Sequence, residues 1–295
     1  MNKIMRTIPA SELIINPDGS VFHLHLRPEQ LADRVILVGD PGRVEAVAGC
    51  FDAVESRTAS REFVSATGTY KGVRMTVLSH GIGTDNIDIV MTELDALANV
   101  DFAARTIRTE KKKLYIVRLG TSGALQPGLR LGDCVLAETS VGFDGLLNFY
   151  AARDSVCDLP MEKAFVCHMD WNPRLAAPYF VHSSPFLNAV FKEATVPGIT
   201  VSAPGFYGPQ GRVVRLPLAD PELNAKLETF RFGERRITNY EMESSALAAL
   251  AALLGHEATT ICTIIAQRVN MESAPDYRPH VRRMIEMALD KMAGI

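Results

Sequence analysis

Short apolar runs alternate with amphipathic stretches along most of this chain. A short run rich in apolar residues and bounded by glycine or polar residues predicts a buried strand. Such runs occupy residues 35–38, 74–78, 114–118, 133–137 and 259–266. The first three are followed by glycine beside polar residues, which indicates a turn at the end of each strand.

Between the second and third of these strands, apolar residues recur at helical spacing from Ile87 to Leu97, and Asp85 is the expected N-cap. Residues 242–254 and 281–292 predict two further helices. Alternating strands and helices are typical of an α/β fold, so we expect a single domain over residues 1–295, with a central mixed sheet flanked by helices. Residues 146–184 have the weakest periodicity and are expected to form an insertion on this domain.

Composition argues against several functional classes. The net charge of −3 and the lack of a basic stripe speak against nucleic-acid or membrane partners. The five cysteines form no C-x-x-C pair, so we predict neither a metal site nor a disulfide framework. The N-terminus lacks the apolar core of a signal peptide, and the longest apolar run, 246–254, is too short to span a membrane. We therefore expect a cytoplasmic protein.

Three of the predicted strand ends carry glycine next to groups that bind anions. The sequences are GDPGR at 39–43, GIGT at 81–84 and RLGTSG at 118–123. Open α/β sheets bind ligands at the carboxyl ends of their strands, and glycine lets backbone N–H groups approach an anion. Arg43 and Arg118 add positive charge there, and Thr121 adds a hydroxyl. Because neither a Walker loop nor a G-x-G-x-x-G pattern is present, a single small phosphate fits better than a nucleotide.

The segment FYGPQGR at 206–212 holds an aromatic pair, Gln210 and Arg212 in a stretch too rich in glycine and proline for a regular helix or strand. A glutamine amide donates and accepts, whereas an arginine only donates. Together they match the edge of uracil, which presents an acceptor, a donor and an acceptor, while an aromatic ring such as Phe206 covers the face of a base. By itself, the segment fits a surface loop with a turn at Gly208-Pro209 better than a base site.

Taken together and in order, these motifs resemble the nucleoside phosphorylases of the uridine phosphorylase type. The likeness runs from about Val21 to the last helix. It rests on VFHL at 21–24, GDPGR at 39–43, SREF at 60–63, GIG at 81–83, RLGTSG at 118–123, FYGPQGR at 206–212, NYEMES at 239–244 and QR at 267–268. Each motif is short, and the order and spacing of all eight make the resemblance specific.

The resemblance implies reversible phosphorolysis, in which a nucleoside and inorganic phosphate give the free base and ribose 1-phosphate, with no cofactor. The implied phosphate site consists of Gly39, Arg43, Arg118 and Thr121, completed by Arg61 from a neighbouring subunit. The implied ribose site consists of Met242 and Glu243, with His23 reaching across from the neighbour. The implied base site consists of Ser122, Gly123, Phe206, Gln210 and Arg212. We therefore expect a homo-oligomer with shared active sites, with dimer and hexamer both left open.

Elementary chemistry agrees with these roles and makes Arg118, Arg212 and Glu243 the catalytic candidates. Arginines offset the charge of the phosphate dianion and orient it toward the anomeric carbon. The glycosidic bond should break through a cation-like ribose, whose two hydroxyls an ionised Glu243 can accept. The base leaves with negative charge on its carbonyl oxygens, and Arg212 and Gln210 stabilise that charge, so no general acid is required.

The residues after the late strand favour a pyrimidine. Purine-cleaving relatives carry an aspartate there, whereas here the strand runs into Gln267-Arg268. Cytosine would present an amino group to the donor-only Arg212, at about 1–3 kcal/mol for each unpaired donor. We therefore predict uridine phosphorolysis in pyrimidine salvage, with deoxyuridine and thymidine undecided. The alternatives are a purine nucleoside phosphorylase or nucleosidase, and a catalytically silent nucleoside-binding homologue.

Two positions depart from the pattern of the bacterial relatives. Asp85 adds an acid after the glycine pair, which either weakens phosphate binding or only caps the helix. Glu62 stands where those relatives bind a monovalent cation between subunits, but the partner position is Asn86. A cation site at the subunit interface is therefore left open.

Overall fold

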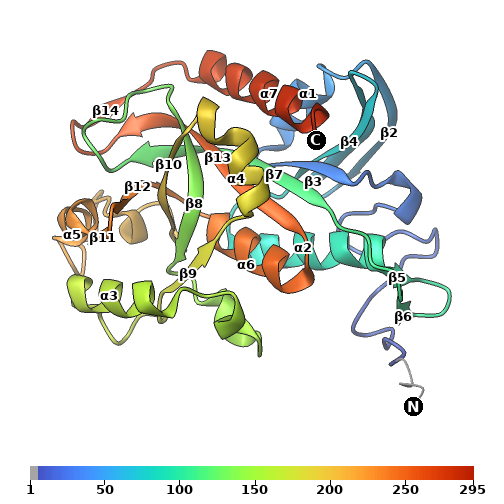
Figure 1. Cartoon of the computed structure of the whole chain (residues 1–295), viewed down its shortest axis with the longest axis horizontal. Helices are drawn as coiled ribbons and strands as arrows, with labels where there is room; N and C mark the ends of the chain where they lie inside the picture. The colour runs from blue at the N-terminus through green and yellow to red at the C-terminus, as the bar shows by residue number, and fades with distance from the viewer. Residues whose placement is uncertain (1–5) are drawn as a thin grey trace.

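The computed structural model describes residues 6–295 and is built around a twelve-stranded mixed sheet (Figure 1). The strands of this sheet are β1 Arg34–Val38, β2 Ala53–Ser60, β3 Phe63–Tyr70, β4 Val73–Ser79, β7 Tyr115–Ala124, β8 Cys134–Gly142, β9 Tyr179–His182, β10 Val196–Ser202, β11 Arg231–Phe232, β12 Arg235–Glu241, β13 Glu257–Gln267 and β14 Glu272–Ser273. Two short strands, β5 Val100–Asp101 and β6 Thr106–Ile107, pair separately. The helices are α1 Pro41–Ala48, α2 Thr84–Asn99, α3 Leu159–Met169, α4 Pro185–Phe191, α5 Leu223–Thr229, α6 Ser244–Leu254 and α7 Arg278–Ala293.

The strand order is β11-β12-β10-β8-β13-β7-β1-β4-β3-β2, and the sheet partly closes on itself. β1 is parallel to both β4 and β7, and β7 is parallel to β13. The end of β12 also pairs with the end of β7, through Tyr240 opposite Gly123. The strands β7, β13, β8, β10 and β12 therefore form a closed ring of pairings, which brings the residues after β12 beside the glycine-rich end of β7.

Helices cover both faces of the sheet, as the alternating side chains of β1 require. Val35 and Leu37 pack with α2 and α6, whereas Ile36 and Val38 pack with α1, α4 and α7. In Figure 1, α7 lies along one face and α2 and α6 along the other. A third cluster lies under α3 and α5, and Phe165 at its centre contacts four other aromatic rings. No helix within residues 6–295 is long and apolar enough to cross a membrane.

The α/β fold with a central mixed sheet is confirmed, and several element ends differ from the prediction. β7 continues through the glycine motif to Ala124, because its ring pairings to β12 and β13 satisfy the backbone there. Gly83, with a φ of 98°, takes the N-cap position of α2, so the prediction of Asp85 as the cap is wrong. Asp85 lies in the first helical turn, where its charge favours the helix dipole.

The weakly periodic segment 146–184 contains regular structure. α3 buries Met161, Phe165 and Met169, which recur four residues apart, and β9 pairs antiparallel with β8 in the main sheet. The helical spacing was therefore present in the sequence, but flanking prolines and the 3-10 turns before α3 obscured it. The β2–β3 hairpin was also missed, because its first strand is mostly exposed and polar.

Candidate active site

A cavity of about 890 Å³ opens where β1, β4, β7, β12 and β13 end. All but two of the predicted site residues line it. These are Gly39, Arg43, Arg118, Thr121, Ser122, Gly123, Phe206, Gln210, Arg212, Met242 and Glu243. Strand pairing explains why they meet, since the carboxyl ends of neighbouring parallel strands share one edge of a sheet.

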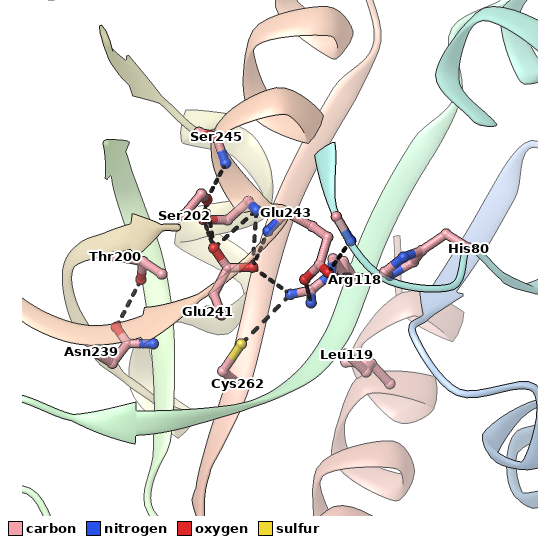
Figure 2. Close-up of polar contacts among 12 residues, drawn as sticks. His80, Arg118, Leu119, Thr200, Ser202, Asn239, Glu241, Glu243, Ser245 and Cys262 are labelled. Atoms are coloured by element: carbon pink, nitrogen blue, oxygen red, sulfur yellow. Dashed lines mark hydrogen bonds and ion pairs between the residues drawn. The ribbon is translucent and has the colours of Figure 1, made fainter. Parts of the chain in front are cut away.

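Arg118 is buried in this cavity and contacts protein groups on three sides (Figure 2). Nη1 lies 2.9 Å from Glu241 Oε2 and Nη2 pairs with Glu243 Oε2. Nε donates to His80 Nε2 at 3.1 Å, and Nη1 also approaches the buried Cys262 Sγ at 3.7 Å. Burial by itself would lower the pKa of Arg118, but the Glu243 and Glu241 carboxylates raise it. The guanidinium is therefore a fixed cation.

Glu243 occupies the N-cap position of α6 and is also buried. Its Oε1 accepts a hydrogen bond from Gly83 N at 2.7 Å, which links it to the start of α2. Burial raises the pKa of Glu243 to about 7, Arg118 opposes that rise, and the neighbouring Glu241 adds to it. The carboxyl group is thus poised to change charge near neutral pH.

Glu241 ends β12 and is the most heavily bonded carboxylate of the cluster. It accepts from Ser202 Oγ at 2.5 Å, from Ser244 Oγ at 2.7 Å and from the backbone N–H groups of Glu243 and Ser244 (Figure 2). With Arg118 as a further partner, both oxygens are saturated. Glu241 therefore holds the turn from β12 into α6, and with it Glu243, in one conformation.

Arg43 supplies the second cation of the cavity from the first turn of α1. Asp40 caps this helix by accepting from Gly42 N, and Pro41 starts it, which is a favoured arrangement at a helix N-terminus. Arg43 Nη1 donates to Leu119 O at 3.0 Å. Burial, and then repulsion by Arg118, lower the pKa of Arg43. Two neighbouring cations that repel each other indicate a site for an anion.

Gln210 and Arg212 lie side by side in the wall of the cavity. Gln210 is 3% exposed, and its Oε1 accepts from Arg212 Nη1 at 2.6 Å. The guanidinium of Arg212 lies 3.7 Å from the centre of the Phe206 ring and covers one of its faces. A base that stacks on Phe206 must therefore stack on the opposite face of the ring. Burial, and then Arg268, lower the pKa of Arg212 to about 10.

The loop that carries these residues also borders a second cavity of about 1170 Å³. Arg212 lines both cavities, whereas Tyr207, Gly208 and Pro209 line only the second one. Residues 169–172 and Leu175 of the predicted insertion form part of its wall. This segment is therefore a neighbour of the loop 206–212.

His23 and Arg61 are the two predicted site residues that do not line the cavity of their own chain. His23 is held by Glu93 of α2, whose Oε1 lies 2.6 Å from His23 Nδ1. Arg61 is exposed at the tip of the β2–β3 hairpin, with a φ of 54°. Their predicted action on a neighbouring subunit stays a prediction.

Sequence reasoning missed His80, Glu241 and Cys262 as members of the Arg118 cluster. Glu241 lies inside the motif NYEMES, two residues before Glu243, and His80 directly precedes the motif GIGT, but Cys262 gave no signal. Tyr277 was also missed, and it lines the cavity from the start of α7. Gln267 is buried and donates to the carbonyls of Gln126 and Leu129, at 2.9 and 2.8 Å. This side chain therefore stabilises the chain conformation at the end of β13.

Glu62, the residue linked to a cation in bacterial relatives, lines the cavity beside Asn86. Asn86 Nδ2 donates to Glu62 Oε1 at 3.3 Å. Within residues 6–295, no group of three or more histidine, cysteine, aspartate or glutamate residues is arranged to hold a metal ion.

Comparison with known proteins gives consistent results. The sequence model of the Phosphorylase superfamily matches residues 33–295. A uridine phosphorylase of Thermococcus kodakarensis is 30% identical over 263 residues, which covers 86% of this chain and 80% of that protein. A DeoD-type purine nucleoside phosphorylase of Geobacillus stearothermophilus is 24% identical over 271 residues, which covers 91% of this chain and 97% of that protein.

Among solved structures, a Trypanosoma brucei nucleoside phosphorylase described as showing uridine phosphorylase activity superimposes with a TM-score of 0.88 at 28% identity. The match covers 96% of this chain and 100% of that one. The family match, the relatives and the shared fold agree with one another. This chain belongs to the Phosphorylase superfamily.

Proposed function

We propose that this protein is a uridine phosphorylase, which converts uridine and phosphate to uracil and ribose 1-phosphate and runs in both directions. The observation that carries the proposal is one cavity that holds two arginines suited to phosphate, a buried glutamate, and a paired glutamine and arginine. The uridine phosphorylases to which the chain is similar support the same assignment.

Phosphate binds between Arg43, Arg118 and the backbone after β1. Gly39 fits closely at this edge, since a Cβ at this position would lie 3.3 Å from Gly81 O and crowd the end of β4. Thr121 contributes a hydroxyl from β7. Together, the two guanidinium groups offset the charge of the phosphate dianion, and holding it beside the nucleoside removes the entropic cost of a bimolecular encounter.

In the chemical step, a phosphate oxygen forms a bond to the anomeric carbon while the bond from that carbon to the base nitrogen breaks. The electron pair of the broken bond stays on the base, which leaves as an anion and takes a proton from solvent. The ribose passes through a cation-like state that the phosphate stabilises. Glu243 binds the ribose hydroxyls, and ionisation of its carboxyl group strengthens these hydrogen bonds.

Gln210 and Arg212 read the base and stabilise its departing charge. With Gln210 Oε1 held toward Arg212, the amide NH₂ is left to donate to a base carbonyl, and the second lone pair of Oε1 can accept the ring N–H. Arg212 keeps further N–H groups for the other carbonyl. Cytosine would offer an amino group to this arginine, so discrimination in favour of uracil follows.

The residues at the end of β13 speak against purine cleavage. Gln267 has its amide donors bound to backbone carbonyls and its Oε1 accepts from Val269 N at 2.9 Å, so it has no group left for a purine ring. Arg268 follows, and a guanidinium holds its proton too tightly to transfer it to a purine nitrogen.

Uracil release from uridine, measured with and without phosphate, tests the proposal, and inosine serves as the purine control. We expect phosphate-dependent uracil release and little turnover of inosine. R212M should lower kcat/KM for uridine by at least about 100-fold, the effect of losing an oxyanion donor. The matched variant R215M changes an exposed arginine of the second cavity and should keep wild-type activity. Uracil release at the same rate with and without phosphate would refute the proposal.

The active enzyme is, in this proposal, a homo-oligomer in the cytoplasm. His23 and Arg61 do not line the cavity of their own chain, so in this proposal a neighbouring subunit brings them to one. All five cysteines are free, which suits a reducing compartment. Mixing the inactive variants R61A and R212M tests the shared site, because mixed oligomers should regain some activity only if Arg61 acts across subunits.

A further inference from the structure

His80 is a fully buried histidine that lies between two groups of the proposed phosphate site. Its Nε2 accepts a hydrogen bond from Arg118 Nε at 3.1 Å (Figure 2). On the other side, its Cε1 lies 3.7 Å from the place that a Cβ on Gly39 would occupy. The ring therefore lies between Arg118, which lines the cavity, and the loop after β1.

The geometry requires a single form of the imidazole. Nε2 must be unprotonated to accept from Arg118, so a neutral ring carries its proton on Nδ1. Burial, and then the positive charges of Arg118 and Arg43, hold the pKa of His80 well below its ordinary value. Nδ1 makes no hydrogen bond of ordinary geometry among residues 6–295, although the nearby Gly81 backbone opposes part of the fall in the pKa of the ring. The well-formed hydrogen bond of the ring is therefore the one from Arg118.

The two carboxylates and His80 contact different nitrogen atoms of Arg118. Glu241 and Glu243 both bind its terminal Nη atoms, and among residues 6–295 its Nε is bound by His80 alone. Without an acceptor at Nε, a buried N–H would be left unpaired, and the guanidinium could leave its present orientation while it stays paired with the two carboxylates. An arginine rotated in that way presents fewer donors to an anion in the cavity.

We propose that His80 is a positioning residue that fixes the orientation of Arg118 for phosphate binding. The inference rests on the proposed phosphorolysis, in which Arg118 binds phosphate. It predicts a selective defect, since phosphate affinity depends on Arg118 whereas the base is read by residues of another loop.

The test compares H80M, which keeps much of the volume but offers no comparable acceptor, with H80Q, whose Oε1 lies as many bonds from the backbone as Nε2. In H80M, the KM and the calorimetric Kd for phosphate should rise by at least about tenfold, which corresponds to about 1.4 kcal/mol. H80Q should stay within about threefold of the wild type, and the KM for uridine should change by less than about twofold in both. Wild-type phosphate affinity in H80M, or equal loss in both variants, would overturn the proposal.

His256 provides the matched control, because it is a second buried histidine, at the opposite end of the sheet before β13. H256M should leave phosphate affinity unchanged, which separates a specific effect from a general loss of stability. Phosphate titration needs no nucleoside, so it also separates this inference from the proposed turnover of uridine.

A measurement on the wild-type protein covers the case in which H80M does not fold. Nitrogen-15 spectra of the histidine rings should show His80 with unprotonated Nε2 and protonated Nδ1 across pH 6 to 8. The H80Q spectrum assigns the signal by its absence. A proton on Nε2, or an ordinary histidine titration, would refute the hydrogen bond on which the proposal depends.

Discussion

Replacing Glu243 with glutamine should change how the stability of this protein depends on pH. Glu243 is buried against Arg118 and Glu241, and its pKa is raised from the ordinary 4.5 to about 7. The native protein therefore keeps a proton that the unfolded chain releases at lower pH. Since the unfolded state binds fewer protons in this range, the free energy of unfolding falls as pH rises from 4.5 to about 7.

The size of this effect follows from the interval between the two pKa values. At about 1.4 kcal/mol for each pH unit, the full interval corresponds to about 3 kcal/mol. Between pH 5.5 and 8, titration of this one carboxyl should remove about 2 kcal/mol of stability. Glutamine resembles the protonated carboxyl in size and charge and does not titrate, so E243Q should lack this loss.

Urea denaturation at pH 5.5 and pH 8, at one fixed protein concentration, measures the difference. The stability of E243Q relative to the wild type should increase by about 2 kcal/mol from the lower to the higher pH. E234Q, at an exposed glutamate between β11 and β12, is the control and should follow the wild-type slope. An E243Q slope equal to that of the wild type would show that the buried carboxyl does not carry the proton.

Three further substitutions test the packing and the loops around the cavity. F165A should lower the free energy of unfolding by about 3–5 kcal/mol in chemical denaturation, because this ring is buried among four others; a loss below about 1 kcal/mol would contradict it. E93A removes the anchor of His23 and should lower kcat/KM by about tenfold in the uridine assay, and unchanged kinetics would refute that link. G211A adds a Cβ 2.5 Å from the side chain of Asn224 at a φ of 67°, and should raise the KM for uridine. The control is G233A, which has a φ of 58° and open space around the added Cβ. It should cost only about 1 kcal/mol of stability and leave the KM for uridine unchanged.

Much of the fold was readable because local signals agreed with the tertiary structure. The apolar runs at 35–38 and 74–78 became β1 and β4, and the helical spacing from Ile87 to Leu97 became α2. The elements that were missed have weak local signals. β2 is mostly exposed and polar, and α3 follows two 3-10 turns and has a proline in its first turn, so neither has the apolar run or the clear boundary on which a prediction depends.

The candidate site was readable as a set of residue types but not as an arrangement. Gln210 and Arg212 are two positions apart, so their pairing follows from local geometry. Arg118 and Glu243 are 125 positions apart, and their contact depends on the pairing of β12 with β7. The role of Phe206 also needed the structure, because one face of its ring is taken by Arg212.

The sequence by itself determined the α/β class, the strand ends that carry glycine and arginine, and the glutamine and arginine of the loop 206–212. These are properties of short segments, and the chemistry of each segment belongs to its own side chains. Only the tertiary structure decided that Arg118 is bounded by His80, Glu241 and Glu243, that Glu243 is poised near neutral pH, and that His23 and Arg61 lie outside their own cavity. The physical reason is that burial and charge pairing depend on which strands end beside one another, and a closed ring of strand pairings sets that order through contacts distant in the chain.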